Sequence, residues 1–147
     1  MRKSGIRWTC RVTLMAVGMI APTWAQQART MKIRMDVNGT RVTATLDDSE
    51  TSRDFISLLP LTLTVEDYNG TEKISNLAKK LSTKGAPDGV DPSVGDIAYY
   101  APWGNLAIFY KDFGYSAGLV KLGRIDSGAE VFRRPGTLRV TIQRAQE

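Results

Sequence analysis

The segment from Gly95 to Ile125 constrains the fold of this chain more than any other part of its sequence. It reads GDIAYYAPWGNLAIFYKDFGYSAGLVKLGRI and holds seven aromatic residues and five of the chain's 13 glycines in 31 positions. β-prone runs alternate in it with stretches whose residues favour turns and loops. The runs are Asp96–Tyr100, Leu106–Tyr110 and Leu119–Ile125, with a turn at Pro102–Asn105 and a loop at Lys111–Gly118 between them. The segment therefore predicts three consecutive strands.

The sequence before this segment begins with the pattern of a β-hairpin. In Met31–Val37, apolar residues alternate with charged ones, which indicates a strand with one buried face. Asn38 and Gly39 follow, a pair that tolerates the positive φ angles of a tight hairpin turn. Val42, Ala44 and Leu46 then continue the alternation. We expect the two runs to pair antiparallel.

The remaining elements are short and follow one another closely. An acidic stretch precedes a helix that Thr51 or Ser52 could cap and that Pro60 ends. Glu72–Leu81 fits either a short helix or an irregular strand. The other expected elements are strands at Leu61–Val65 and Leu138–Ile142, a turn at Asn69–Gly70, a loop at Ser82–Val94 and an extended piece at Ala129–Arg133. Many short strands with glycine-rich turns predict a mainly β protein, a closed or nearly closed barrel with one or two short helices.

The first 25 residues have the layout of a secretory signal peptide. A basic start without acidic residues precedes the apolar run Val12–Ala21, and Thr23–Ala25 places small residues where a signal peptidase reads. The run is shorter than the roughly 20 apolar residues that a membrane span needs. We predict cleavage after Ala25, a linker at residues 26–30 and one domain at residues 31–147. The expected location is the periplasm or the exterior, with no membrane span after cleavage.

Removing this segment changes the charge and the cysteine content. The chain carries a formal charge of +5, and four basic residues at positions 2, 3, 7 and 11 leave with the signal, so that +5 − 4 = +1 remains. A charge so close to neutral gives no general reason to expect nucleic-acid binding. The one cysteine, Cys10, also leaves. The remaining 120 or so residues must therefore be held by one hydrophobic core without a disulfide.

Familiar catalytic and metal-binding patterns are poorly supported. Gly114–Gly118 matches G-x-S-x-G, but the nucleophile elbow of esterases needs a histidine and a following helix, and the chain has no histidine. A Ser116–Lys121 pair remains a formal alternative. Asp88 and Asp91 could bind calcium weakly or serve as solvated loop residues. We assign no catalytic residue, no metal ligand and no cofactor.

The aromatic residues of the central segment are the candidates for a functional site. Alternation places Tyr99 and Tyr100 on opposite faces of one strand, and Phe109 and Tyr110 on opposite faces of the next. One member of each pair should be in the core and the other outside it or in a groove. We therefore weigh Tyr100 as a residue of a surface groove.

Three further aromatic residues lie in turns and loops, where strand packing does not need them. Trp103, Phe113 and Tyr115, together with Tyr100 and the nearby Arg124, could form a shallow apolar ligand site with a cationic donor. The alternative is that these rings plug one end of the barrel. Both interpretations depend on how the loops fold back.

The central segment, together with the first hairpin and the run TVEDYNGTEKISNL, resembles small bacterial proteins with a cyclophilin-like barrel. The run YYAPWGNLAIFY is distinctive, and the resemblance covers roughly residues 31 to 143. It implies a compact β-barrel with a short helix or two. It implies no settled activity, because these small relatives are mostly uncharacterised.

Two functions compete on these observations. The first is a binding module for a short peptide or a small apolar ligand, which we favour over an enzyme. The second is a peptidyl-prolyl isomerase, a reaction that needs an apolar pocket and a hydrogen-bond donor but no nucleophile. Arg124 is the preferred donor, with Arg34 and Arg41 as weaker candidates. The phenylalanine, methionine and glutamine cluster of the cyclophilin-like site is missing, since Met31 and Met35 are the sole methionines after residue 25.

Overall fold

The structure is a computed structural model that describes residues 31–146. The predicted signal peptide at residues 1–25 and the linker at residues 26–30 lie outside the described residues. Within residues 31–146, no helix is long and apolar enough to cross a membrane.

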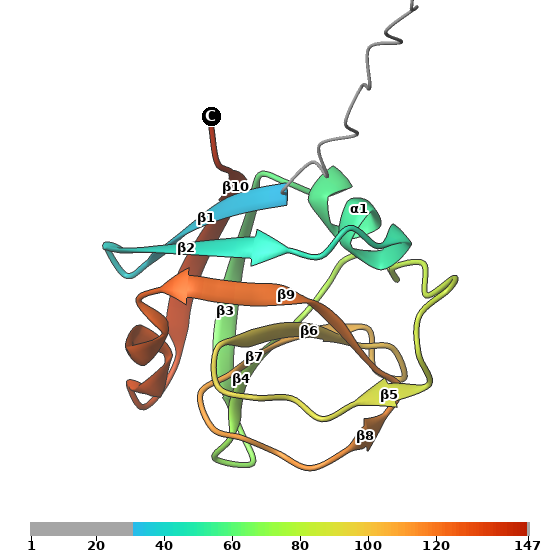
Figure 1. Cartoon of the computed structure of the whole chain (residues 1–147). Helices are drawn as coiled ribbons and strands as arrows, with labels where there is room; N and C mark the ends of the chain where they lie inside the picture. The colour runs from blue at the N-terminus through green and yellow to red at the C-terminus, as the bar shows by residue number, and fades with distance from the viewer. Residues whose placement is uncertain (1–30, 147) are drawn as a thin grey trace, which may run out of the picture.

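Eight antiparallel strands close into a barrel in the order β1-β10-β3-β4-β7-β6-β9-β2 (Figure 1). The barrel strands are β1 (Met31–Val37), β2 (Thr40–Leu46), β3 (Leu61–Tyr68), β4 (Glu72–Asn76), β6 (Asp96–Tyr100), β7 (Asn105–Phe109), β9 (Leu119–Ser127) and β10 (Leu138–Arg144). A separate two-stranded sheet pairs β5 (Gly89–Val90) with β8 (Ser116–Ala117). One helix, α1 (Glu50–Ser57), and one 3-10 helix, η1 (Ala129–Arg133), complete the described part of the chain. The predicted closed, mainly β barrel is confirmed.

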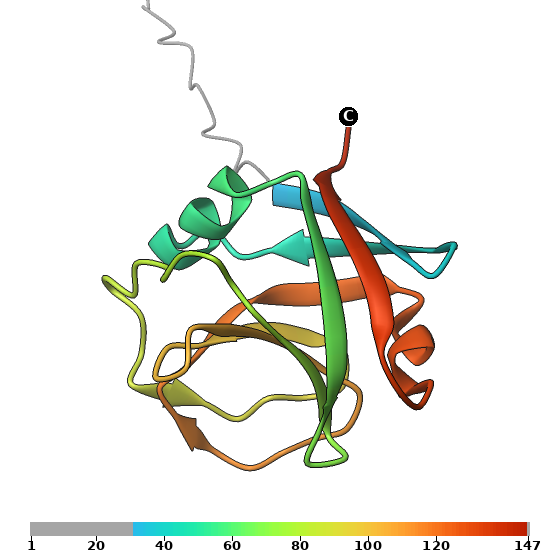
Figure 2. The same ribbon diagram turned by 180° about the vertical axis from the view of Figure 1, so that it is seen from behind.

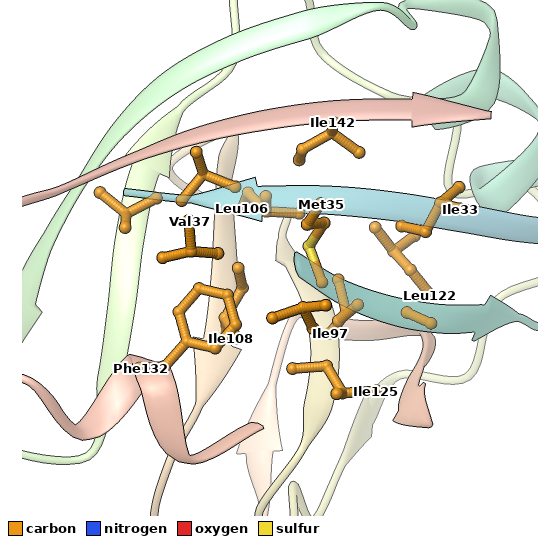
Figure 3. Packing of buried hydrophobic residues seen from close by; sticks show 14 of the residues in the cluster. Ile33, Met35, Val37, Ile97, Leu106, Ile108, Leu122, Ile125, Phe132 and Ile142 are labelled. Carbon is orange, nitrogen blue, oxygen red and sulfur yellow. The ribbon is translucent and has the colours of Figure 1, made fainter. Parts of the chain in front are cut away.

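Apolar side chains from the inner face of the strands fill the barrel (Figure 3). Ile33, Met35 and Val37 of β1 are fully buried, as the alternation of that strand predicts. They belong to one core cluster with Ile108 of β7 and Phe132 of η1. The core therefore joins the first hairpin to the central segment.

The two predicted Asn-Gly turns have the expected left-handed backbone. Asn38 and Gly39 have φ angles of 47° and 84°, and Asn69 and Gly70 have φ angles of 52° and 65°. Consecutive positive φ angles give a hairpin turn whose twist matches that of the flanking strands. These turns set the β1–β2 and β3–β4 hairpins.

The two short helices differ from the predicted elements. Ser49 caps α1 by accepting a hydrogen bond from the Ser52 backbone N–H, whereas we predicted Thr51 or Ser52 as the cap. Ser52 is instead buried, and its hydroxyl donates to the Leu122 carbonyl at 2.9 Å. Ala129–Arg133 forms the 3-10 helix η1 rather than an extended piece, because Gly128 turns the chain with a φ of 86° and the buried Val131 and Phe132 then face the core.

The first half of the ambiguous stretch Glu72–Leu81 is the strand β4 (Glu72–Asn76), which places one charged side chain inside the barrel. Lys73 is fully buried, and its Nζ lies 2.9 Å from Asp67 Oδ2. The same Nζ donates to the carbonyls of Arg134 at 2.7 Å and Gly136 at 2.6 Å. Tyr110 donates its hydroxyl to Asp67 Oδ1 at 2.8 Å. Because Lys73 points inward, its neighbours along β4 point outward.

A second apolar cluster lies on the outer face of the barrel. Ala98, Ala107, Phe109 and Leu119 are buried there, although they alternate with residues of the inner core. The long connections that carry β5 and β8 lie beside this part of the barrel (Figures 1 and 2). Gly118 links them to the barrel, because its N–H donates to Asp88 and its carbonyl accepts from Ala101. These connections position the candidate site.

Candidate functional site

A groove of about 210 Å³ runs over the outer face of β4, β6 and β7. Its floor is apolar: Ile74, Ala107, Phe109 and Leu119 line it, and the last three are almost fully buried. Ile74 of β4 pairs with Ala107 of β7 in the barrel register. The floor is therefore rigid sheet, and the sides come from the turn after β6 and the loop after β7.

Trp103 stands at one side of the groove between two tyrosines. Its ring centroid lies 5.4 Å from that of Tyr68 at an interplanar angle of 88°, and 5.4 Å from that of Tyr100 at 78°. Edge-to-face contacts of this kind hold aromatic rings in fixed orientations. Trp103 is nevertheless 56% exposed. The ring is thus held in place and still open to solvent.

The turn that carries Trp103 is tied down on both sides. Gly104 adopts a positive φ of 73°, and its N–H donates to the Tyr100 carbonyl at 2.8 Å. Its carbonyl accepts from the Leu77 N–H at 3.1 Å. Glycine adopts a positive φ at no steric cost because it has no Cβ. Gly104 therefore fixes the position of the neighbouring Trp103.

Two polar residues line the groove beside the aromatic rings. Glu72 is half-buried, and burial raises the pKa of its carboxyl even though the Thr71 hydroxyl donates to Oε2. Asn105 is 2% exposed, its Nδ2 donates to the Leu106 carbonyl at 3.2 Å, and its Oδ1 has no hydrogen-bond partner among residues 31–146. Buried polar atoms usually have a partner. Glu72 is the one charged residue that lines this groove in the described part of the chain.

The structure brings together three of the five predicted site residues. Tyr100, Trp103 and Phe113 all line the groove, and Phe113 is 43% exposed. Tyr115 is 62% exposed but is not a lining residue. Its ring lies against β5, where a Cβ built on Gly89 would come within 2.8 Å of it. Because the turn and loop aromatics are exposed, they do not plug the barrel.

Arg124, the fifth predicted residue, does not line the groove. Its Nη1 lies 3.3 Å from Asp96 Oδ1, and its Nη2 donates to the Val94 carbonyl at 3.0 Å. Asp96 is 3% exposed and also pairs with Lys121 at 3.1 Å. The guanidinium therefore holds the start of β6 in place.

The two weaker arginine candidates lie on another face. Arg34 and Arg41 line a separate hollow of about 140 Å³ on the strands β1, β2 and β10. Arg34 donates to Gln143 Oε1 at 2.9 Å. Neither arginine lines the groove beside Trp103.

Phe109 and Tyr110 take opposite faces of β7, as predicted. Phe109 belongs to the outer cluster and lines the groove, and Tyr110 belongs to the inner core. Both are buried, however, because the loops after β7 cover the outer face as well. The sequence period reports which face a residue takes but not what covers that face.

Sequence reasoning missed several residues of the groove, among them Tyr68, Glu72 and Asn105. One signal could have found two of them. The Asn69–Gly70 turn fixes the hairpin register, in which Tyr68 pairs with Glu72. An aromatic and a carboxylate therefore lie side by side next to the turn of the β3–β4 hairpin. Asn105 and Phe109 join them only because β4 pairs with β7.

The described residues form neither a nucleophile elbow at Gly114–Gly118 nor a cluster of metal ligands. Gly114–Gly118 contains β8 and leads into β9 rather than into a helix, so that the strand-turn-helix of a nucleophile elbow is not formed there. Among residues 31–146, no group of three histidine, cysteine, aspartate or glutamate side chains could hold a metal ion. The groove can bind a ligand through apolar contact, aromatic faces and hydrogen-bond acceptors.

Comparisons with known proteins agree with this architecture. The model of the cyclophilin-like family matches residues 35–143. Among solved structures, the solution structure of a hypothetical protein from Archaeoglobus fulgidus is similar, with a TM-score of 0.57 and 18% sequence identity over 82% of this chain and 99% of that chain. This likeness concerns the fold. No curated protein matches the chain.

Proposed function

This chain belongs to the cyclophilin-like family, and we propose that it is a binding module that holds a short peptide or a small apolar ligand in the groove beside Trp103. The observation that carries the proposal is the exposure of Trp103. A large aromatic side chain that is 56% exposed stands over a floor of buried apolar residues. Ligand sites are commonly concave and apolar with a few convergent polar groups.

The groove is built to stay open without a ligand. Its floor is barrel sheet, and Trp103 is held by two tyrosines and by the Gly104 turn. Preorganised side chains lose little conformational entropy on binding, which favours affinity. The barrel is closed, so that a peptide on the groove floor cannot add a strand to the barrel and would bind there through its side chains.

Binding is better supported than prolyl isomerisation. Isomerisation would need a hydrogen-bond donor that reaches the twisted amide in the apolar site, and we expected an arginine to provide it. No arginine lines the groove in the part of the chain that the structure describes. Arg124 is bound to Asp96 and Val94 instead.

A titration with blocked tripeptides that carry a central norleucine or phenylalanine tests the proposal. The readout is the 1H–15N spectrum of the protein, in which the Trp103 indole N–H and the Phe109 amide should shift with saturable dependence on peptide concentration. Trp103→Ala should weaken binding by at least about tenfold, the effect of a truncated aromatic contact. Tyr115→Ala is the matched aromatic comparison and should bind as the wild type does, because its ring lies outside the groove.

Two results would contradict the proposal. The first is no saturable shift at Trp103 or Phe109 with any of the peptides. The second is an equal loss of affinity for Trp103→Ala and Tyr115→Ala, which would place binding elsewhere on the aromatic surface. Circular dichroism spectra of both variants must match the wild type for the comparison to count.

A further inference from the structure

The groove combines two features that favour a cationic ligand. They are exposed aromatic rings and a half-buried carboxylate. We propose that the groove selects a lysine side chain of a short peptide segment, held by its ammonium group near Glu72 and the rings around Trp103. This inference rests on the proposed function and specifies its ligand.

The rings supply the first part of the argument. Tyr68, Tyr100 and Trp103 come from β3, β6 and the turn after β6, and they converge with centroids 5.4 Å apart in both contacts of Trp103. Since the contacts are close to perpendicular, the ring faces point in different directions. The face of an aromatic ring attracts a cation, and the attraction is strongest for tryptophan. Converging rings beside a groove are the arrangement that recognises alkylammonium groups.

The charge of the groove supplies the second part. Glu72 is the one charged residue among its lining residues, and no lysine or arginine lines it in the described range 31–146. The nearest lysine along the strand, Lys73, points into the barrel and is bound by Asp67 and two carbonyls. A half-buried carboxylate without a cationic partner favours a ligand that brings a positive charge and disfavours an anion.

The Glu72 carboxylate decides between lysine and arginine. Thr71 already donates to Glu72 Oε2, so a guanidinium that bound both carboxylate oxygens would have to share Oε2 with that hydroxyl. A guanidinium binds best to both oxygens of a carboxylate, whereas an ammonium group is a compact charge that can bind at Oε1 alone. The groove therefore suits lysine better than arginine.

The test compares three blocked tripeptides that differ in the central side chain alone: Ala-Lys-Ala, Ala-norleucine-Ala and Ala-Arg-Ala. Norleucine keeps much of the aliphatic chain of lysine and removes the charge. Calorimetry or the shift of the Trp103 indole N–H measures each affinity at neutral pH. The lysine peptide should bind about threefold to thirtyfold more tightly than the norleucine peptide, the range that cation–π contacts give. The arginine peptide should bind less tightly than the lysine peptide.

Two variants test which residues cause the preference for the lysine peptide. Glu72→Gln should reduce the ratio of the affinities for the lysine and norleucine peptides. Trp103→Leu keeps an apolar contact and removes the aromatic face, so it should also reduce the ratio of the two affinities. Because Glu72 and Trp103 lie on different elements, either variant tests the inference as long as it folds. The circular dichroism spectrum of each variant shows whether it folds.

The outcomes separate this inference from the proposed function. If the norleucine peptide binds as tightly as the lysine peptide, the selection for a cation is wrong and the binding module stands. Selection is equally wrong if the arginine peptide binds best, or if the lysine preference is undiminished in folded Glu72→Gln. If none of the three peptides binds, both proposals fail.

Discussion

The rings of Tyr68 and Trp103 meet at 88° with their centroids 5.4 Å apart, although one ends β3 and the other lies in the turn after β6. They meet because β4, which returns from Tyr68, pairs with β7, which leaves the turn of Trp103. The contact leaves both rings exposed, Tyr68 by 40% and Trp103 by 56%. The candidate site is thus a product of barrel closure.

Glu72 should contribute to ligand binding and not to stability. Burial raises the pKa of its carboxyl, so the folded state holds the proton more tightly than the unfolded state does. The contribution of Glu72 to stability is therefore most favourable below the unfolded pKa and is lost as the pH rises through the folded pKa. At pH 7, Glu72→Gln should leave the free energy of unfolding within about 1 kcal/mol of the wild type or raise it. Urea unfolding at pH 7 measures this, and a loss of several kcal/mol would show a structural role.

Lys73 should be essential for stability. Lys73→Met keeps the aliphatic stem but removes the ammonium group that binds Asp67 and the carbonyls of Arg134 and Gly136. We expect a loss of roughly 2–3 kcal/mol, at the low end for a broken buried pair because Asp67 is partly open to solvent. The control Lys79→Met breaks an exposed pair with Asp54 and should cost less than about 1 kcal/mol. Equal losses in urea unfolding would contradict this distinction.

The Lys73 pair should also give the protein a specific acid dependence. Lys73, followed by the Tyr110 hydroxyl and the Gly136 N–H, keeps the pKa of Asp67 below its ordinary value. The resulting stability is present above the unfolded pKa of an aspartate and is lost as the pH falls through the lower folded pKa. In Lys73→Met the main cause of the shift is gone. Stability measured between pH 5 and pH 2 should therefore fall less steeply in Lys73→Met than in the wild type, and parallel curves would argue against the pair.

Gly123 should tolerate no side chain. A Cβ at this position would lie 2.6 Å from Leu46 Cα and would also collide with the Thr45 carbonyl on the neighbouring strand β2. Gly123→Ala should destabilise the protein by about 2–3 kcal/mol, the cost of overpacking against backbone. Gly114→Ala is the matched control, because no atom lies within 4 Å of its Cβ. It should be neutral or stabilising by up to about 1 kcal/mol. Thermal unfolding of both variants would refute the argument if their midpoints fell equally.

Arg124 should not act as a catalyst of prolyl isomerisation. Its guanidinium is bound to Asp96 and the Val94 carbonyl and does not line the groove. We expect isomerisation of a short proline peptide at the uncatalysed rate with the wild type, and the same rate with Arg124→Ala. A coupled protease assay measures both. Strong catalysis that disappears in Arg124→Ala would replace the binding module with an isomerase.

We also propose that the chain is exported to the periplasm or beyond and is cleaved after Ala25. The support is the basic start, the apolar run at residues 12–21 and the small residues at positions 23 and 25. Expression of the full chain in a bacterium should yield a periplasmic protein whose N-terminal sequence begins at Gln26. Recovery from the cytosol with residues 1–25 intact would overturn the proposal.

Much of the fold is readable in the sequence because its causes are local. Alternation along Met31–Val37 predicts one buried face, and the structure buries Ile33, Met35 and Val37 as expected. The Asn-Gly pairs predict positive φ angles, which depend on two adjacent residues only. Short stretches with competing preferences were less readable. Ala129–Arg133 became a 3-10 helix because the core takes up Val131 and Phe132.

The candidate site could be predicted only in part. Turn chemistry identified Trp103 and loop position identified Phe113, since aromatic rings in such places are not required by strand packing. The partners of these rings depend on long-range pairing. Closure of the barrel places Glu72 opposite Phe109 and Asn76 opposite Asn105, which carries the carboxylate and the amide into the groove. The same closure pairs Asp96 with Arg124 on β9 and holds the arginine outside the groove.

Sequence by itself determined the strands and turns, because their periods and φ angles are local. Only the tertiary structure decided which side chains meet, because strand neighbours in a closed barrel come from distant parts of the chain.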